Sequence, residues 1–202
     1  MKIGLIGGTF NPIHHGHLIL SEYVRENCQL DKVIFIPTGL PPHKSESVVK
    51  DPEIRLEMTK MAIESNQYFR VSHIETYRQG LSYTIDTIKE LKILYPNDQL
   101  YFIIGADSLF ELPTWKYYEK LISTTNIIVV NRPGGANNLI GAKIKEYEDE
   151  FGGNIIEVKS PLIDISSSDI RDRVKAGKSI KYLVPSNVEE YILQNSLYKE
   201  GF

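Results

Sequence analysis

The chain has 202 residues, of which 42% are hydrophobic and 24% are charged, and this length and composition fit a globular protein with an ordinary core and exclude a disordered chain. Its 23 Lys and Arg residues against 26 Asp and Glu residues give a formal charge of −3, so no global basic field favours binding to DNA or RNA. Cys28, the single cysteine, excludes an internal disulfide and a cysteine cluster for zinc, and favours a reducing cytoplasm.

Short apolar segments alternate with amphipathic segments along the chain. The strand candidates are apolar on both faces of the pleat, which is typical of strands that are covered on both sides. They are residues 3–6, 33–36, 100–104 and 127–130, with weaker candidates at 69–72 and 155–158. Helical patterns lie at about 16–27, after the start signal Asp51-Pro52, at 83–94, and at about 168–175 and 186–194.

The alternation of strands and helices predicts right-handed βαβ crossovers. We therefore expect an α/β fold, in which a Rossmann-like, doubly wound, mostly parallel sheet carries helices on both faces. No repeat or linker divides the chain, so residues 1–202 are predicted to form a single domain, with the C-terminal helical part, about 166–202, packed on it. The segments 39–49 and 133–138 are rich in Gly, Pro and polar residues and are predicted surface loops.

The turn after the first strand predicts an anion-binding site. Gly7-Gly8 follows that strand, and ligands of open α/β sheets bind where the carboxyl end of a strand meets the next helix. The dinucleotide fingerprint G-x-G-x-x-G is absent, because the glycines have the wrong spacing. The segment 176–179, AGKS, mimics the end of a P-loop, but the required earlier glycine would fall on Asp172. A phosphate site built on histidine is the third alternative.

Three of the five histidines lie just after this turn. His14 and His17 are three residues apart, so they share one face of a helix that begins there. An isolated pair of this kind is more often a helix-start cluster with one buried histidine, and a metal site would need further ligands. The adjacent Gly-Gly pair favours an anion pocket instead, in which imidazoles and backbone N–H groups donate hydrogen bonds to phosphate.

Two segments carry a resemblance to a known family. Residues 8–17, GTFNPIHHGH, resemble the H-x-G-H signature of the nucleotidyltransferase superfamily, and the form GGTFNPIHxGH resembles bacterial nicotinate-nucleotide adenylyltransferases. Residues 165–171, ISSSDIR, resemble the second superfamily signature, I-S-S-T-x-I-R, with Ser168 where the family commonly has Thr. Helix capping alone explains one of these serines, whereas three hydroxyls followed by Arg171 suit a polyphosphate.

Further blocks resemble the nicotinate-nucleotide enzymes, and each has an ordinary structural alternative. Taken alone, PPHK at 41–44 is typical of a surface loop. The start of a helix would explain both SYTIDT at 82–87 and GADS at 105–108. A lone tryptophan such as Trp115 is more often a core residue. NRPG at 131–134 resembles a family turn that follows a strand. Relatives often carry Tyr after the tryptophan, where this chain has Lys116.

The resemblance implies a reaction and a site. The reaction joins nicotinate mononucleotide to ATP in NAD biosynthesis and releases pyrophosphate, with Mg²⁺ arriving on ATP and no protein ligand assigned to it. The implied catalytic residues are His14, His17, Lys44 and Arg171, with His43 beside Lys44 near the triphosphate. The implied ATP-binding residues are Gly8, Thr9, Phe10, Gly105, Asp107, Arg132, Ser166 and Ser167, and those for nicotinate mononucleotide are Thr84, Trp115 and Lys116.

Three alternatives stay open. A pantetheine-phosphate adenylyltransferase would leave the 82–87 and Trp115 blocks unexplained, and an enzyme for nicotinamide mononucleotide would not need a carboxylate pocket. A sensor that binds ATP without catalysis would not need both histidines together with Arg171. No apolar run approaches the roughly 18 residues of a membrane span, so we expect no membrane as partner. The small net charge leads us to expect no nucleic acid as partner, and the single cysteine leads us to expect a cytoplasmic protein. The oligomeric state is left open, a homo-oligomer included.

Overall fold

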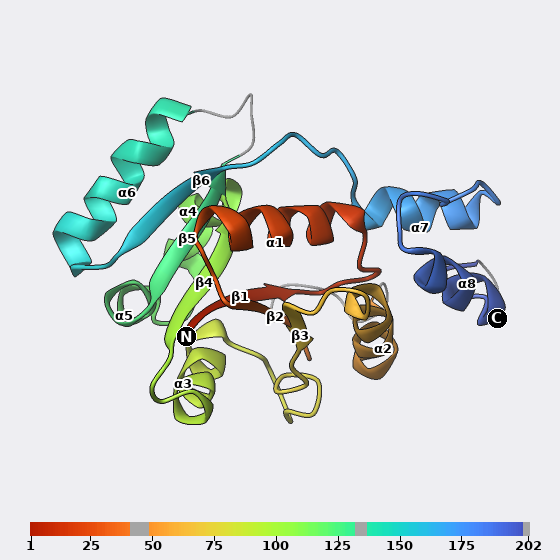
Figure 1. The fold of residues 1–202 in the computed structure, drawn as a ribbon, viewed down its shortest axis with the longest axis horizontal. Helices are drawn as coiled ribbons and strands as arrows, with labels where there is room; N and C mark the ends of the chain where they lie inside the picture. The colour runs from red at the N-terminus through yellow and green to blue at the C-terminus, as the bar shows by residue number, and fades with distance from the viewer. Residues whose placement is uncertain (41–48, 132–136, 200–202) are drawn as a thin grey trace.

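The centre of the protein is a six-stranded, all-parallel sheet with the strand order β3-β2-β1-β4-β5-β6 (Figure 1). The computed structural model describes residues 1–40, 49–131 and 137–199. The strands are β1 (Lys2–Gly8), β2 (Lys32–Pro37), β3 (Phe69–Val71), β4 (Gln99–Gly105), β5 (Asn126–Asn131) and β6 (Ile155–Lys159). All the predicted strands are present, the two weaker candidates included, and the doubly wound α/β prediction is confirmed.

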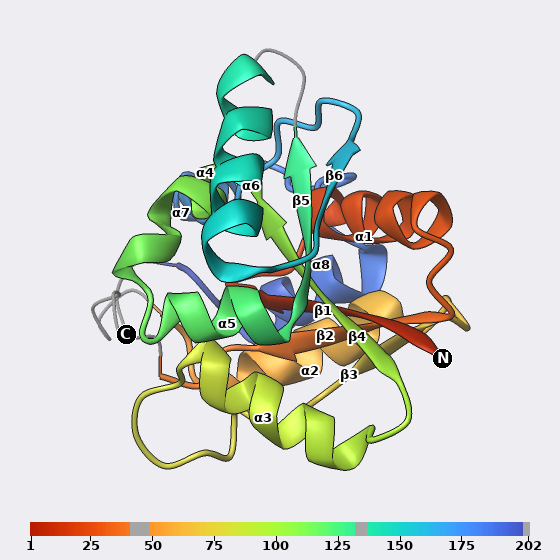
Figure 2. The ribbon, with the colours of Figure 1, turned by 90° about the vertical axis from the view of Figure 1, so that its left-hand side faces the viewer.

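Helices cover both faces of this sheet (Figures 1 and 2). One face packs against α1 (His15–Asn27), α2 (Pro52–Ile63), α7 (Ser167–Lys175) and α8 (Ser186–Gln194). The other packs against α3 (Thr84–Leu94), α4 (Ala106–Glu111), α5 (Tyr118–Thr124) and α6 (Asn137–Phe151). Successive side chains of β1 alternate between these two cores, since Leu5 belongs to the second and Ile6 to the first. Burial on both faces explains why the strands are apolar throughout.

The helices α1, α3, α7 and α8 agree with the predicted ranges to within a residue or so at each end, and α2 begins at the predicted start signal. The helices α5 and α6 were not predicted, and α4 was anticipated only as the helix-start alternative for residues 105–108. The longest of the missed helices is α6, with 15 residues. Its buried residues Ile140, Ile144 and Tyr147 are four and three positions apart, which is a helical stripe that periodicity alone could have revealed. The predicted loop 133–138 is wrong at its end because α6 begins at Asn137. Of the other predicted loop, residues 41–48 lie outside the described part of the chain.

The strand order places a ligand crevice at the carboxyl ends of β1 and β4. The chain proceeds from β1 to β2 and β3 on one side of the sheet, and from β4 to β5 and β6 on the other. Such a reversal between two adjacent parallel strands is the point where open α/β sheets bind ligands. Gly7 near the end of β1 and Gly105 at the end of β4 are both exposed there, so the backbone at this edge is accessible.

The C-terminal helices pack against the start of the chain. Figure 1 shows α7 beside the first turn of α1 and α8 beside α2. Ile170 of α7 and Val188 of α8 belong to the same buried cluster as Ile6 of β1, and the Asn187 side-chain amide donates a hydrogen bond to the Met61 carbonyl at 2.7 Å. Within the described ranges, no helix has the length and apolar character needed to cross a membrane.

Candidate active site

The turn that follows β1 has an unusual backbone. Phe10 is a buried, non-glycine residue with a left-handed φ of 46°, a conformation that costs an ordinary side chain free energy. A Cβ atom at Gly8 would lie 2.8 Å from the Phe10 ring, so only glycine fits beside that ring. A Cβ atom at Gly7 would meet only Phe102, at 3.7 Å. Gly8 therefore lets the Phe10 ring pack directly on the backbone, and Gly7 leaves its own backbone exposed.

The two histidines of the H-x-G-H segment lie against each other at the start of α1. His14 is the N-cap residue and is 6% exposed, whereas His17 is half-buried. Their rings stack with centroids 3.7 Å apart, as the spacing of three residues predicts. The His14 backbone N–H donates a hydrogen bond to Nδ1 of His17 at 3.3 Å. Because Nδ1 of His17 accepts, a neutral His17 carries its proton on Nε2, where it can donate to a ligand.

A cavity of about 280 Å³ opens beside these histidines. It lies between the start of α1 and the segment that joins β6 to α7, both of which appear at the upper right of Figure 1. Its lining combines imidazole rings and hydroxyl groups with apolar side chains. The lining residues are Ile6, His14, Gly16, His17, Leu20, Ser160, Pro161, Ile163, Ile165, Ser166 and Ser167. Residues from the two signature segments, about 150 positions apart in the chain, therefore share one cavity.

Hydrogen bonds join the start of α7 directly to the turn after β1. The Ser167 hydroxyl donates to the Pro12 carbonyl at 2.9 Å, and Nη1 of Arg171 donates to the Asn11 carbonyl at 2.8 Å. Ser166 is the N-cap residue of α7, and its hydroxyl oxygen accepts from the Asp169 N–H at 3.1 Å. The capping alternative thus holds for Ser166. The helix N-terminus also directs its positive dipole end toward the cavity that Ser166 and Ser167 line.

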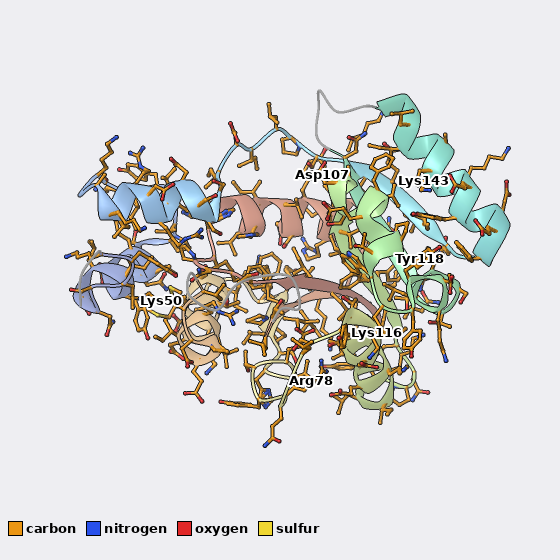
Figure 3. The ribbon with its side chains drawn as sticks, turned by 180° about the vertical axis from the view of Figure 1, so that it is seen from behind. Lys50, Arg78, Asp107, Lys116, Tyr118 and Lys143 are labelled. Carbon is orange, nitrogen blue, oxygen red and sulfur yellow. The ribbon has the colours of Figure 1, made fainter. Side chains whose placement is uncertain are left out.

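The carboxyl end of β4 contributes a second set of polar groups. Gly105 is the N-cap residue of α4, so Asp107 lies in the first turn of the helix and is not its cap. Asp107 is exposed, and Figure 3 shows it at the start of α4. The edge of the sheet beside β1 therefore carries an accessible carboxylate.

A separate group of residues lies at the N-terminus of α3, on the sheet face that carries α3–α6. Trp115 is half-buried and packs edge-on against Phe102, with ring centroids 6.2 Å apart. Phe102 is also the side chain nearest to Gly7, so one ring connects Trp115 to the end of β1. Lys116 is exposed, and its Nζ lies 4.0 Å from the centroid of the Tyr83 ring (Figure 3).

Thr84 is the first residue of α3, directly after the N-cap Tyr83. The N-terminal N–H groups of a helix lack partners within the helix and favour an anion. The Trp115 N–H already donates to the Leu112 carbonyl at 2.8 Å. An anion at this place would thus meet the α3 N-terminus and the Lys116 ammonium, while the Trp115 amide is engaged elsewhere.

The remaining candidates, Lys44 with its neighbour His43, and Arg132, lie outside the described residues. Sequence reasoning missed two buried ionisable residues. Arg55 donates a hydrogen bond to the Thr9 carbonyl of the turn, and Glu75 lies beside Gly39, which follows β2. Burial lowers the pKa of Arg55 and raises the pKa of the Glu75 carboxyl, and a hydrogen bond from the Thr87 hydroxyl at 2.6 Å partly offsets the second effect. The helical period could have revealed Arg55, because it lies three positions before Met58 and seven before Ala62, on the buried face of α2.

Comparison with known proteins agrees with this geometry. The chain matches the cytidylyltransferase-like family over residues 5–173. A probable nicotinate-nucleotide adenylyltransferase of Thermoanaerobacter sp. (strain X514) is 47% identical over 201 residues, covering 99% of this chain and 95% of the relative. One of Desulfitobacterium hafniense (strain Y51) is 46% identical over 198 residues, covering 98% and 96%. The structure of the Plasmodium falciparum nicotinic acid mononucleotide adenylyltransferase complexed with NaAD has the same fold, with a TM-score of 0.80 at 21% identity, covering 98% of this chain and 97% of that one.

Proposed function

This chain belongs to the nicotinate-nucleotide adenylyltransferase family, within the cytidylyltransferase-like proteins, and on that premise we propose that it transfers the adenylyl group of ATP to nicotinate mononucleotide. A phosphate oxygen of the mononucleotide attacks the α-phosphorus of ATP. The bond from that phosphorus to the bridging oxygen of the β-phosphate breaks, so pyrophosphate leaves and nicotinate adenine dinucleotide forms in NAD biosynthesis. The observation that carries this conclusion is a cavity that both signature segments line, with His14, His17, Ser166 and Ser167.

The chemistry requires alignment more than activation of the nucleophile. A phosphate monoester has a second pKa near 6, so at neutral pH it is already largely a dianion. The enzyme must hold two polyanions in line and offset the negative charge that the triphosphate concentrates in the transition state. Hydrogen-bond donors and cations at the sheet edge serve this purpose, and no serine nucleophile or strong base is needed.

We assign these donors to the triphosphate. The Nε2–H of His17 is a donor on the cavity wall, and the His14 ring stacks against the His17 ring. The backbone of Gly8, Thr9 and Phe10, the hydroxyls of Ser166 and Ser167, and the N-terminal dipole of α7 surround the same space. Arg171 adds a positive charge next to the turn through its bond to the Asn11 carbonyl. Lys44 is proposed as a further cation on the strength of the PPHK resemblance.

Mg²⁺ is proposed to arrive with ATP. The described residues contain no group of three or more His, Cys, Asp or Glu side chains that could hold a metal ion, and the cavity wall presents imidazoles and hydroxyls that suit phosphate oxygens. This donor set fits an ion that is carried by the phosphates and water. When bound, Mg²⁺ would offset charge on the phosphate oxygens.

Adenosine and pyridine are assigned to two different edges of the site. Gly105 leaves the backbone open, and the exposed Asp107 carboxylate suits the ribose hydroxyls of ATP. Arg132 is proposed for the adenine side. Trp115 supplies an aromatic face for the pyridine ring, and the helix N-terminus at Thr84 together with Lys116 suits the nicotinate carboxylate.

The deciding experiment measures pyrophosphate release from ATP with three acceptors: nicotinate mononucleotide, nicotinamide mononucleotide and phosphopantetheine. We expect pyrophosphate release with nicotinate mononucleotide and a kcat/KM at least ten times lower with nicotinamide mononucleotide. The α3 N-terminus and the Lys116 ammonium attract the carboxylate, which the amide lacks. Equal kcat/KM for acid and amide would refute the substrate assignment, and no release with any acceptor would refute catalysis.

We also propose a cytoplasmic location for the protein, which the single free cysteine, Cys28, supports.

A further inference from the structure

From the contacts beneath the turn after β1, we infer that Arg55 and Tyr198 are positioning residues for adenylyl transfer: they hold the turn from within the core so that its backbone meets the triphosphate in one geometry. The inference rests on the proposed function. Neither residue lines the cavity, and each acts through the main chain or side chain of a turn residue. Their origins differ, since Arg55 comes from α2 and Tyr198 from the segment after α8.

Arg55 is a fully buried cation that, among the described residues, donates hydrogen bonds to four main-chain carbonyls. Its side chain is 0% exposed. Nη1 donates to the Thr9 carbonyl at 2.6 Å, and Nη2 donates to the carbonyls of Thr38 at 2.6 Å and Gly39 at 3.1 Å. Nε donates to the Lys50 carbonyl at 2.8 Å. A buried charge is retained only where its donors are satisfied, so the planar guanidinium dictates where these carbonyls lie.

The same guanidinium ties the ends of two neighbouring strands together. Thr9 follows β1 and Thr38 follows β2, and the Thr38 N–H also donates to the Gly8 carbonyl at 2.9 Å. The fork geometry of an arginine joins both ends at fixed separation, which a lysine with its single ammonium group cannot reproduce. Any shift of the β2 end is therefore transmitted to the turn at Thr9.

Tyr198 holds the turn two residues further along. It is 5% exposed, and its hydroxyl donates to Oδ1 of Asn11, itself buried, at 2.9 Å. Burial raises the pKa of the Tyr198 phenol, opposed by the charges of Arg171 and Arg55, so the hydroxyl keeps its proton and remains a donor. The Asn11 side chain also accepts from the Lys50 N–H at 3.3 Å. Lys50, labelled in Figure 3, directly precedes Asp51, the N-cap residue of α2.

The chain near its C-terminal end is bent to reach this position. After α8 ends, Ser196 and Tyr198 both adopt left-handed backbone angles, with φ of 49° and 64°. Non-glycine residues keep such angles only where surrounding contacts determine them. The contacts here are burial of Leu197 and Tyr198 in the core that also contains Phe10, together with the bond to Asn11.

These contacts matter for catalysis because the turn is held at three of its residues, Thr9, Asn11 and Pro12. Arg55 binds the Thr9 carbonyl, Tyr198 binds the Asn11 side chain, Arg171 binds the Asn11 carbonyl and Ser167 binds the Pro12 carbonyl. A displacement of about 1 Å in a reacting group reduces the rate by roughly a hundredfold. Loss of one support should therefore lower kcat more than it weakens substrate binding.

The test compares Tyr198→Phe with Tyr191→Phe. The first removes only the hydroxyl that reaches Asn11, and the second removes a hydroxyl from a tyrosine of α8 that packs against the same core. We expect Tyr198→Phe to lower kcat roughly 10- to 100-fold with both KM values within about threefold of the parent, while Tyr191→Phe stays within about twofold. All rates are measured well below the melting temperature of each variant, so that unfolding does not contribute.

Arg55→Lys and Arg55→Met supply a second, independent series. We expect Arg55→Met to lose more kcat than Arg55→Lys, because lysine keeps the charge and part of the bonding. Amide hydrogen exchange over residues 9–13 gives a readout without turnover, and it should be faster in Tyr198→Phe than in Tyr191→Phe. Parent-like kcat and exchange in Tyr198→Phe would overturn the inference, as would equal losses in Tyr191→Phe. If the unmodified protein makes no dinucleotide, the proposed function fails. The exchange rates would still show whether Tyr198 holds the turn after β1 in place.

Discussion

Replacement of His17 separates its catalytic contribution from its structural one. In His17→Ala the Nε2–H donor is lost from the cavity, and one lost donor to a developing oxyanion costs about 10²–10³ in rate. The same change removes the Nδ1 acceptor for the His14 N–H, worth about 1 kcal/mol as a helix cap, and the edge contact with Phe10 at 5.0 Å between centroids, worth roughly 1 kcal/mol. We therefore expect kcat to fall 10²–10³-fold and the stability by only about 2 kcal/mol.

Two amide variants divide these effects. In His17→Asn the side-chain oxygen takes the place of Nδ1, so it can accept from the His14 N–H but has no donor where Nε2 was. In His17→Gln the amide nitrogen takes the place of Nε2 and can donate to phosphate, while the cap acceptor is lost. We expect Asn to recover the melting temperature without the activity, and Gln to recover part of the activity without the melting temperature.

The assay is initial-rate pyrophosphate release with both substrates saturating, together with thermal unfolding of each variant. The reasoning would be refuted by a kcat of His17→Ala within about threefold of the parent, since a donor to the transition state cannot be that weak. It would equally be refuted if His17→Asn turned over faster than His17→Gln, because the donor position would then not be Nε2.

Three further changes test two residues of the pyridine side and one buried carboxyl group. Trp115→Ala should raise KM for nicotinate mononucleotide roughly tenfold through loss of stacking and leave KM for ATP unchanged, and a parallel rise in both constants would contradict this. Lys116→Met should reduce the acid-over-amide preference about two- to fivefold, the scale of an exposed charge, and an unaltered ratio would remove the ammonium from the carboxylate site. Burial raises the folded-state pKa of Glu75 above its ordinary 4.5, so the folded protein binds the proton more tightly than the unfolded chain and stability decreases as pH rises from 4.5 through the raised pKa. In Glu75→Gln this pH-dependent loss should disappear from thermal unfolding curves, whereas a pH dependence identical to that of the parent would show that Glu75 does not carry it.

Local patterns were sufficient for the strands, for the two signature segments and for five helices, which are α1, α2, α3, α7 and α8. The strands are apolar on both faces and the helices carry apolar stripes or start signals, and each of these properties is contained in a stretch of about a dozen residues. The prediction that His14 and His17 share a helix face followed from their spacing of three, and the stacked rings agree with it. The helix α6 was missed although its stripe was present, because its first residues adjoin a glycine-rich segment that favoured a loop.

What the chain determined by itself is the type of most of its elements and the proposal of phosphate-binding chemistry after the first strand, because both depend on neighbours along the sequence. Tertiary structure alone decided which distant residues complete that chemistry. The strand order brings β4 beside β1, the core places Arg55 under Thr9, and the end of the chain returns to put the Tyr198 hydroxyl 2.9 Å from Asn11, 187 positions away. Burial and hydrogen-bond satisfaction are properties of the whole packed molecule, so no local pattern around Tyr198 or Arg55 could specify its partner.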